Sequence, residues 1–253
     1  MKCTFTMILV VLSFISKGQN SEMGLNYTYS IPRGSMQYTI SGAHGFTMDY
    51  YFLPKEKPYS FGIEMNVNSY GHDKTRQTYT FEDGSTAPMD IVVNNNFYSI
   101  MMTGRYFLSD KKIRPFITGK AGYSFFTTDL YIYDPDDADH CEPVDSDILS
   151  NDGTVLASVG GGLRLELLPK KNPGAFFLDL SANYSLGGKV EYMNVDAGNM
   201  NHAAHIAHTS DVYAQFINTQ TQVVHEHHVG NVYASPIEVL DFRLGVHFRV
   251  GRK

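Results

Sequence analysis

Apolar and polar residues alternate with a period of two along most of the amino-acid sequence. The clearest case is residues 239–250, where every second position is apolar: Leu240, Phe242, Leu244, Val246, Phe248 and Val250. A β-strand sends successive side chains to opposite sides, so such a segment has one apolar face and one polar face. After residue 18, no apolar run approaches the length of about 20 residues that a membrane-spanning helix needs. The alternation therefore predicts an all-β chain.

Eight segments follow this pattern, and we expect each of them to be a strand. They are residues 24–31, 45–53, 59–68, 97–107, 116–128, 155–167, 176–186 and 239–250. The connections between them alternate strictly between long and short. The short ones, at 54–58, 109–115 and 169–174, contain proline and are mostly basic, and the long ones cover about 32–44, 69–96, 129–154 and 187–238. In an up-and-down meander, this order places every long loop at the same end of the sheet.

Short turns at one end, long loops at the other and strands with one apolar face are typical of outer-membrane barrels. Closure into a barrel also pairs every strand edge, which a hydrocarbon environment requires. A secreted β-sandwich or a lipocalin-like barrel would share the alternation, but it does not account for the strict order of loop lengths. We therefore predict an eight-stranded antiparallel up-and-down transmembrane β-barrel, with its long loops outside the cell.

The first 18 residues are predicted to be a signal peptide. Lys2 precedes an eleven-residue apolar core at 5–15, and small residues then permit cleavage before Gln19. The net charge of −6 becomes −8 in the mature chain, because 18 basic residues then face 26 acidic ones. This balance argues against a nucleic-acid partner. Cys3 precedes the apolar core, so we expect no lipid anchor, and Cys141 is then the only cysteine.

Several short motifs support a family resemblance over nearly all of residues 24–253. They are Gly45-Phe46, Arg114-Pro115-Phe116, Gly160-Gly161-Gly162 and the sequence LGGKVEY at 186–192. With these motifs the chain resembles the small eight-stranded outer-membrane proteins common in Bacteroidetes-type bacteria, the outer membrane protein β-barrel domain. The resemblance implies a porin-like fold in the outer membrane of a Gram-negative cell. It indicates fold far better than function.

All ten formal charges in the eight segments fall on the polar face. Five are acidic and five basic, and His247 shares this face: Asp49, Glu64, Glu166, Asp179 and Asp241 against Arg105, Lys120, Arg164, Arg243 and Arg249. An eight-stranded barrel has a lumen that side chains can just fill. Because buried charges persist only when they are paired, we expect a salt-bridged plug. A narrow gated channel is the alternative interpretation.

Lipid-modifying enzymes with this architecture, acyltransferases and deacylases acting on lipid A, need a histidine beside a serine near the outer membrane interface. We expect no histidine at membrane level to face lipid. His44 and His72 are predicted to lie in outer loops, with Ser41, Ser69 and Asp73 near them in sequence. We therefore predict no enzyme, no catalytic residue and no cofactor, with a lipid A-modifying enzyme as the alternative.

The long loops hold the remaining candidates. The third has eight carboxylates and no basic residue: Asp134, Asp136, Asp137, Asp139, Glu142, Asp145, Asp147 and Asp152. Cys141, in the same loop, would be a free, exposed thiol or an intermolecular link. Its spacing matches no EF-hand, so we interpret it as a solvated acidic loop. The fourth holds six histidines that are weak candidates for Zn²⁺, Ni²⁺ or Cu²⁺: His202, His205, His208, His225, His227 and His228. Loops on a rigid barrel favour contact with other outer-membrane or extracellular proteins over catalysis, and the barrel wall is expected to contact outer-membrane lipid.

Overall fold

The computed structural model describes residues 20–80, 84–135, 143–167, 174–195, 209–217 and 224–250. Its strands are β1 (Asn20–Pro32), β2 (Ala43–Leu53), β3 (Tyr59–Thr80), β4 (Thr86–Phe107), β5 (Ile113–Tyr133), β6 (Asp145–Glu166), β7 (Gly174–Asn194), β8 (Ser210–Ile217) and β9 (Val224–Val250). One short 3₁₀-helix, η1 (Met36–Tyr38), lies between β1 and β2. Within these described ranges, no helix is long and apolar enough to cross a membrane.

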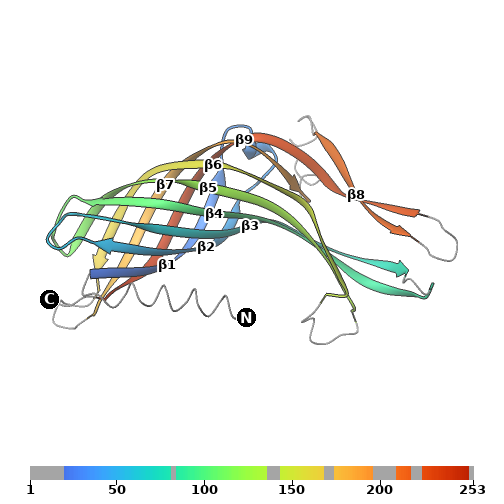
Figure 1. Cartoon of the computed structure of the whole chain (residues 1–253), viewed down its shortest axis with the longest axis horizontal. Coiled ribbons are helices and arrows are strands. Elements are labelled where there is room, and N and C mark those ends of the chain that lie inside the picture. Colours follow the sequence, from blue (N-terminus) through green and yellow to red (C-terminus); the bar gives the residue numbers. More distant parts are fainter. Residues whose placement is uncertain are drawn as a thin grey trace.

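The strands form a closed antiparallel barrel. Each of β1 to β6 pairs with the next strand in sequence, β7 pairs with β9, and β9 pairs back with β1. Tyr27 on β1, for example, lies opposite Phe46 on β2 and opposite Leu244 on β9. The barrel thus has the eight strands predicted from the alternation, while β8 is a further strand attached to β9 beyond the barrel (Figure 1).

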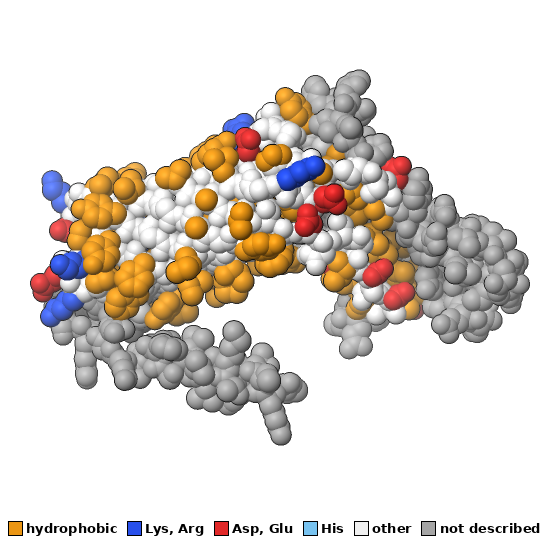
Figure 2. All heavy atoms as spheres, turned by 45° about the horizontal axis from the view of Figure 1, so that its top comes forward, with side chains coloured by type: hydrophobic (Ala, Val, Ile, Leu, Met, Phe, Trp, Pro, Cys, Tyr) orange, Lys and Arg blue, Asp and Glu red, His pale blue; other side chains and the backbone are white. Residues whose placement is uncertain are grey.

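The outer wall of the barrel is apolar. Leu163, Leu180, Leu244 and Tyr27 occupy consecutive positions across β6, β7, β9 and β1, and about half of each side chain is exposed. Figure 2 shows apolar side chains along the outside of the barrel. The residues between them on each strand are polar and point inward. The wall is therefore apolar outside and polar inside, the reverse of a soluble domain.

The predicted loops 69–96, 129–154 and 187–238 are in large part β-hairpins rather than irregular segments. β3 and β4 stay paired out to Thr80 and Thr86, and β5 and β6 out to Ile132 and Asp145. The apolar side of the strands changes at this point. In the barrel the apolar residues of β4 point outward, but further out Ile91 and Val93 point inward and pack with Leu130. The prediction places the apolar residues of each strand on its outer face. It therefore ends each strand where the apolar residues change to the inner face, and the predicted strands are too short. Figure 1 shows these hairpins projecting past the barrel.

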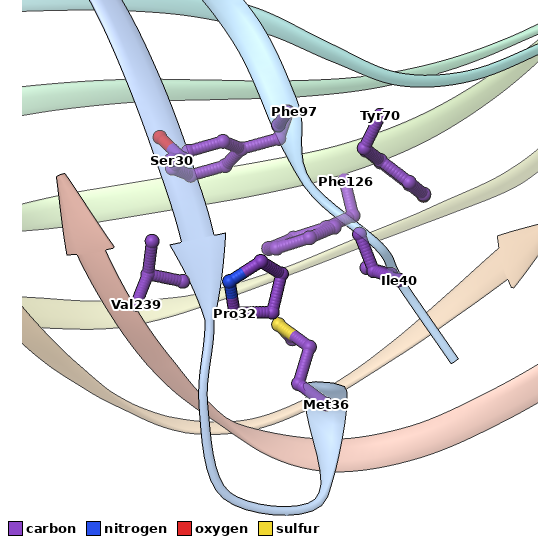
Figure 3. Close-up of a pocket in the computed structure, with 9 residues that line it drawn as sticks. Ser30, Pro32, Met36, Ile40, Tyr70, Phe97, Phe126 and Val239 are labelled. Carbon is purple, nitrogen blue, oxygen red and sulfur yellow. The ribbon is translucent and has the colours of Figure 1, made fainter. Parts of the chain in front are cut away.

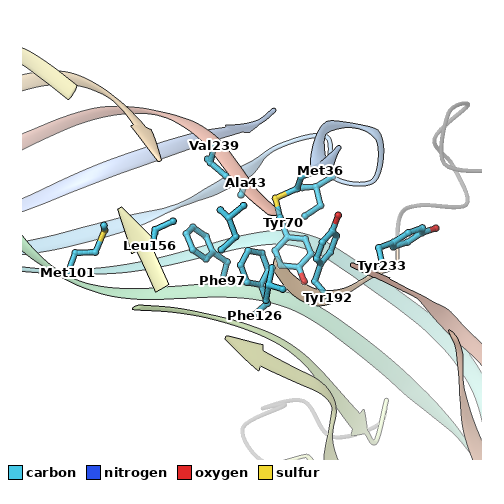
Figure 4. Packing of buried hydrophobic residues seen from close by; sticks show 13 residues of the cluster. Met36, Ala43, Tyr70, Phe97, Met101, Phe126, Leu156, Tyr192, Tyr233 and Val239 are labelled. Atoms are coloured by element: carbon cyan, nitrogen blue, oxygen red, sulfur yellow. The ribbon is translucent and has the colours of Figure 1, made fainter. Parts of the chain in front are cut away.

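The apolar core lies at the outer end of the barrel, where the long connections emerge. Thirteen buried side chains form one cluster there, which we call the outer cluster: Met36, Ile40, Ala43, Tyr70, Phe97, Met101, Phe126, Leu156, Val190, Tyr192, Tyr233, Ile237 and Val239 (Figure 4). The connection between β1 and β2, predicted as a plain loop, folds over the mouth and contributes Met36 and Ile40. Below this cluster, the interior is polar.

Candidate functional site

The candidate site is the interior of the barrel. The structure places all eleven predicted lumen residues on the inward face of their strands. Nine are buried: Asp49, Glu64, Arg105, Lys120, Arg164, Asp179, Asp241, Arg243 and His247. The other two, Glu166 and Arg249, lie nearest the short turns, and their side chains are 12% and 23% exposed.

Two inward charges escaped the prediction because both lie before the start of the predicted strand. Glu22 on β1 is 1% exposed, and Arg114 on β5 is 8% exposed. The alternation does reach Glu22, since Met23, Leu25 and Tyr27 are apolar and Glu22, Gly24 and Asn26 are not. Extending the predicted strand by one two-residue repeat toward the N-terminus would therefore include Glu22. Arg114 binds Glu166, with 2.7 Å between Nη2 and Oε2.

Arg164 is the centre of the charge network, by which we mean the buried ion pairs of the lumen. Its guanidinium donates from Nε and Nη2 to the two oxygens of Asp179, both at 2.7 Å. It also donates from Nη1 to Glu22 at 2.9 Å. Arg105 binds Asp179 at 2.8 Å, and Arg249 binds Glu22 at 3.1 Å. Each of the two carboxylates is therefore shared by two arginines.

His247 lies against the same acids and is fully buried. Its Nδ1 is 3.3 Å from an oxygen of Glu22 and 3.3 Å from an oxygen of Asp49. Its Nε2 is 3.2 Å from Asp179 and 3.3 Å from the side-chain oxygen of Asn26. Both ring nitrogens of His247 thus face acceptor oxygens, and the ring lies within the charge network.

Further toward the outer end, Glu64 joins two cations. Lys120 Nζ is 2.8 Å from Glu64 Oε2, and Arg243 Nη1 is 2.5 Å from Oε1. Asp241 accepts a hydrogen bond from Ser30 at 2.5 Å and lies 3.5 Å from Arg243. The ion pairs therefore continue through the barrel from the turn end toward the outer cluster.

Aromatic rings lie against two arginines at the turn end of the lumen. The Arg105 guanidinium lies 4.4 Å from the ring centre of Tyr51 and 4.3 Å from that of Phe116. Arg164 lies between Phe107 and Phe177, at 5.1 and 4.9 Å. Such cation–π contacts are strongest where water is excluded. We call these two arginines and four rings the basal layer.

At the outer mouth the packing is apolar instead. Thr39, next to η1, hydrogen-bonds through its hydroxyl to the hydroxyl of Tyr192 on β7 at 2.6 Å, which holds the β1–β2 connection in place. Beneath it, a cavity of about 20 Å³ lies between Met36, Ile40, Phe97 and their neighbours (Figure 3). A space of this size can hold one water molecule, but its apolar lining offers none of the partners such a water needs.

Contrary to the prediction, His44 and His72 lie on strands and share one cleft on the outside of the barrel. His44 is on β2 two residues before the exposed Phe46, so it faces outward just beyond the apolar wall. Ser41 and Ser69 line the same cleft of about 380 Å³. The Nδ1 of His44 is 2.6 Å from the hydroxyl of Tyr27, and that of His72 is 2.7 Å from Asn94 Oδ1. The remaining candidate, Asp73, interacts with Thr75.

Half of the carboxylates and half of the histidines in the acidic and histidine-rich predictions lie outside the described residues. Cys141, Asp136, Asp137, Asp139, Glu142, His202, His205 and His208 lie in undescribed segments. The backbone of His225, His227 and His228 belongs to β9. Among the described residues, no group of three or more His, Cys, Asp or Glu side chains could hold a metal ion.

The β3–β4 hairpin has a charge cluster of its own beyond the barrel. Asp90 lies 2.7 Å from Arg76 Nε and 2.9 Å from Lys74 Nζ, and both cations come from the neighbouring strand. Hydrogen bonds from Arg76 and Lys74 hold the pKa of the Asp90 carboxyl well below its usual range. These contacts stabilise the hairpin where no barrel surrounds it.

Comparisons with known proteins show only distant similarity. No protein-family model and no curated protein sequence matches the chain. Among solved structures, the chain is similar to Neisserial surface protein A, with 12% identity, a TM-score of 0.44 and coverage of 91% of this chain and 96% of that one. It is also similar to Ail, the attachment invasion locus protein of Yersinia pestis solved with the heparin analogue sucrose octasulfate, with 11% identity, a TM-score of 0.39 and coverage of 91% and 98%. A major outer membrane protein from Thermus thermophilus has 12% identity, a TM-score of 0.42 and coverage of 90% and 99%. At these identities and TM-scores, none of the similarities indicates what this chain binds.

Proposed function

We propose that this chain is a non-enzymatic integral protein of the outer membrane, with a closed lumen and with outer hairpins that have a structural or surface-interaction role. The observation that carries the proposal is the filling of the lumen by three successive layers. The basal layer closes the turn end, the charge network fills the middle, and the outer cluster covers the mouth.

The apolar wall supports the membrane part of the proposal. Side chains such as Met102, Val159 and Leu180 are 75%, 66% and 56% exposed, and all point away from the lumen. In water, such a continuous apolar band would be an aggregation site. In a bilayer it is the surface that a barrel presents to lipid, and the closed sheet leaves no unpaired strand edge in hydrocarbon.

The layers in the lumen favour a closed barrel over the gated channel. A charged side chain that lines a water-filled pore keeps part of its surface in water. Arg164 and His247 instead have no exposed surface, and Glu64 is 2% exposed. Burial of this kind is tolerable for ions only when they are paired, as they are here.

The hairpins supply the surface-interaction part. From residue 68 to Thr80, β3 runs for about 40 Å at roughly 3.3 Å per residue beyond the predicted strand. The inward residues Ile91, Val93 and Leu130 and the Asp90 charge cluster keep this segment ordered. A preformed surface of this length, fixed on a rigid barrel, suits contact with other outer-membrane or extracellular proteins.

Cysteine labelling on intact cells tests the topology. In a Cys141→Ser background, we expect Thr86→Cys in the β3–β4 hairpin to react with a membrane-impermeant maleimide. Lys111→Cys in the β4–β5 turn is the matched exposed control and should react only after the outer membrane is permeabilised. Reaction of both positions on intact cells would rule out a transmembrane arrangement, and the reverse pattern would invert the orientation.

Two further measurements test closure and binding. In planar bilayers, the purified protein should give no steady conductance, and a steady ion-selective conductance would overturn the closed lumen. A photo-cross-linker attached at Thr86→Cys should give a discrete adduct on intact cells that Lys111→Cys does not give. If neither position gives an adduct, the surface-interaction role is wrong and only a structural role is left.

A further inference from the structure

The outer wall of the barrel has a recess near the short turns. Its volume is about 520 Å³, and its lining includes Phe61, Gly104, Gly119 and Val159. These four residues occupy consecutive positions across β3, β4, β5 and β6. The two glycines therefore form the floor of the recess, and Phe61 and Val159, which are 50% and 66% exposed, form its sides.

The packing of the barrel does not account for these two glycines. A Cβ atom added to Gly119 would meet nothing within 4 Å, and one added to Gly104 would meet only the Gly119 oxygen at 4.0 Å. Neither residue has the positive φ angle that favours glycine. Glycine weakens a strand, and where it occurs inside one it often marks a place that a ligand or another backbone approaches closely. An occupant from outside the barrel would explain both positions.

The surroundings of the recess indicate what this occupant is. Tyr59 and Tyr106 lie opposite each other one repeat closer to the turns and line the end of the recess. Tyrosines at strand ends mark the membrane interface of barrels. Phe61 and Gly104 lie two residues further in, about 7 Å deeper along the strands. The recess therefore opens in the hydrocarbon just inside one interface, where the available apolar ligand is an acyl chain.

Basic side chains lie beyond the tyrosines. Lys55 and Lys57 in the β2–β3 turn and Lys111 and Lys112 in the β4–β5 turn are all exposed, whereas these two turns hold only two acids, Glu56 and Asp110. The amide of Phe107 donates to the carbonyl of Pro58 at 2.6 Å, so the two turns are held together at the ends of β3 and β4. Figure 2 shows Lys and Arg side chains at this end of the barrel, next to the apolar wall. Lysines at this level attract anionic headgroups.

We propose that this recess is a binding site for one anionic phospholipid in the leaflet on the side of the short turns. One acyl chain lies on Gly104 and Gly119, and the phosphate lies against the lysines of the two turns. The proposal rests on the proposed function, because it needs the barrel to be in a membrane.

Native mass spectrometry of the full-length protein, with phosphatidylglycerol or phosphatidylcholine added, tests the site. The wild-type protein should retain one phosphatidylglycerol molecule in preference to phosphatidylcholine. Gly119→Leu fills the recess and should lose this adduct. Ala182→Leu, on the outward face of β7 away from the recess, is the matched control and should retain it. The double variant Lys57→Gln and Lys111→Gln should still bind lipid but lose the preference for phosphatidylglycerol.

Each other outcome counts against the site. Full retention by Gly119→Leu, or equal retention of both lipids by the wild-type protein, would overturn the proposal. A wild-type dimer that Gly119→Leu converts to a monomer would assign the recess to a second copy of the chain and also overturn it. Insertion of every variant into liposomes is measured in parallel. If the wild-type protein does not insert, the proposed function fails, and if it inserts without selective lipid binding, only this inference fails.

Discussion

Replacing Arg164 tests whether the charge network holds the barrel closed. Arg164→Met keeps an unbranched side-chain stem but removes the guanidinium, and with it the charge, between Phe107 and Phe177. Glu22 and Asp179 then lose hydrogen bonds of 2.9 Å and of 2.7 Å, respectively. Both acids are buried, so neither can recover the loss by turning to water.

The expected loss of stability depends on the arginines that these two acids keep. Removing one partner of a buried ion pair costs about 3–5 kcal/mol, because an uncompensated charge stays behind. Here Asp179 keeps Arg105 at 2.8 Å, and Glu22 keeps Arg249 at 3.1 Å. We therefore expect a loss near the lower limit, about 3 kcal/mol. Adding Glu22→Gln removes the acid that Arg164 compensated, so the double variant should recover part of this loss, with a coupling of about 0.5–3 kcal/mol.

Urea unfolding from lipid bilayers measures these differences. The chain contains no Trp, so folding is followed by far-UV circular dichroism and by the migration of unheated samples on SDS gels. Ser158→Ala is the matched lumen control. The Ser158 hydroxyl is buried with no hydrogen-bond partner among the described residues, so its removal should change stability by no more than about 0.5 kcal/mol. Two results would contradict the closed lumen. Either Arg164→Met unfolds at the same urea concentration as the wild-type protein, or the effects of Arg164→Met and Glu22→Gln on stability simply add. Each result would indicate a hydrated lumen and support the channel interpretation.

Three further predictions concern the wall, the hairpin and the cleft. Leu244→Arg on the lipid-facing wall should destabilise the barrel by about 2–4 kcal/mol, whereas the inward Ser181→Asn should be tolerated; equal insertion of both into liposomes would show that the facing is wrong. Hydrogen bonds from Arg76 lower the pKa of Asp90 in the folded protein. The Asp90 carboxylate therefore stabilises the β3–β4 hairpin at pH values above its unfolded pKa of about 3.9, and this stabilisation is lost as the pH falls through the lower pKa of the folded state. Asp90→Asn should accordingly accelerate amide hydrogen exchange in the hairpin at pH 7, and this difference from wild type should shrink at strongly acidic pH; a difference that does not change with pH would contradict the ion-pair explanation. Finally, Ser69 has no hydrogen bond to either histidine of its cleft among the described residues, so overexpression of wild-type protein and of Ser69→Ala should give the same lipid A mass spectrum. A mass change that only the wild-type protein produces would support the enzyme alternative.

The barrel itself could be predicted because one physical rule governs all eight strands. Side chains alternate between lipid and lumen, so a single pattern finds each strand wherever it crosses the membrane. Outside the membrane the rule no longer applies. The hairpin residues Ile91, Val93 and Leu130 have the opposite facing and pack on one another instead of on lipid. The same reason explains why the pattern does not predict β8, since among the described strands it pairs with the outer part of β9 and not with the barrel.

The lumen charges could be predicted as a set but not as pairs. Alternation assigns Arg164 to the inside, but nothing in its neighbourhood in the sequence points to Glu22, which is 142 residues away. This contact exists because β1 pairs with β9 when the barrel closes, and the narrow lumen then brings β1 and β6 within reach of one long side chain. The cleft of His44 and His72 does not depend on closure, but it depends on the register in which β2 pairs with β3. Both sites therefore need the register as well as the pattern.

In the closed lumen that we propose, the two ends are sealed by different chemistry, and this difference bears on what such a barrel can do. At the outer end, apolar side chains exclude water, so the ion pairs below them lie in a medium of low polarity, where charge attraction is strong and a half-broken pair is costly. At the turn end, arginines that belong to the network also stack on aromatic rings, so the network cannot rearrange without losing those contacts. Ion conduction would require both ends and the network between them to open together. The same constraints hold the strands in register, and β3 to β6 carry that register outward into the hairpins. These interactions support our proposal of a rigid base for an outer interaction surface.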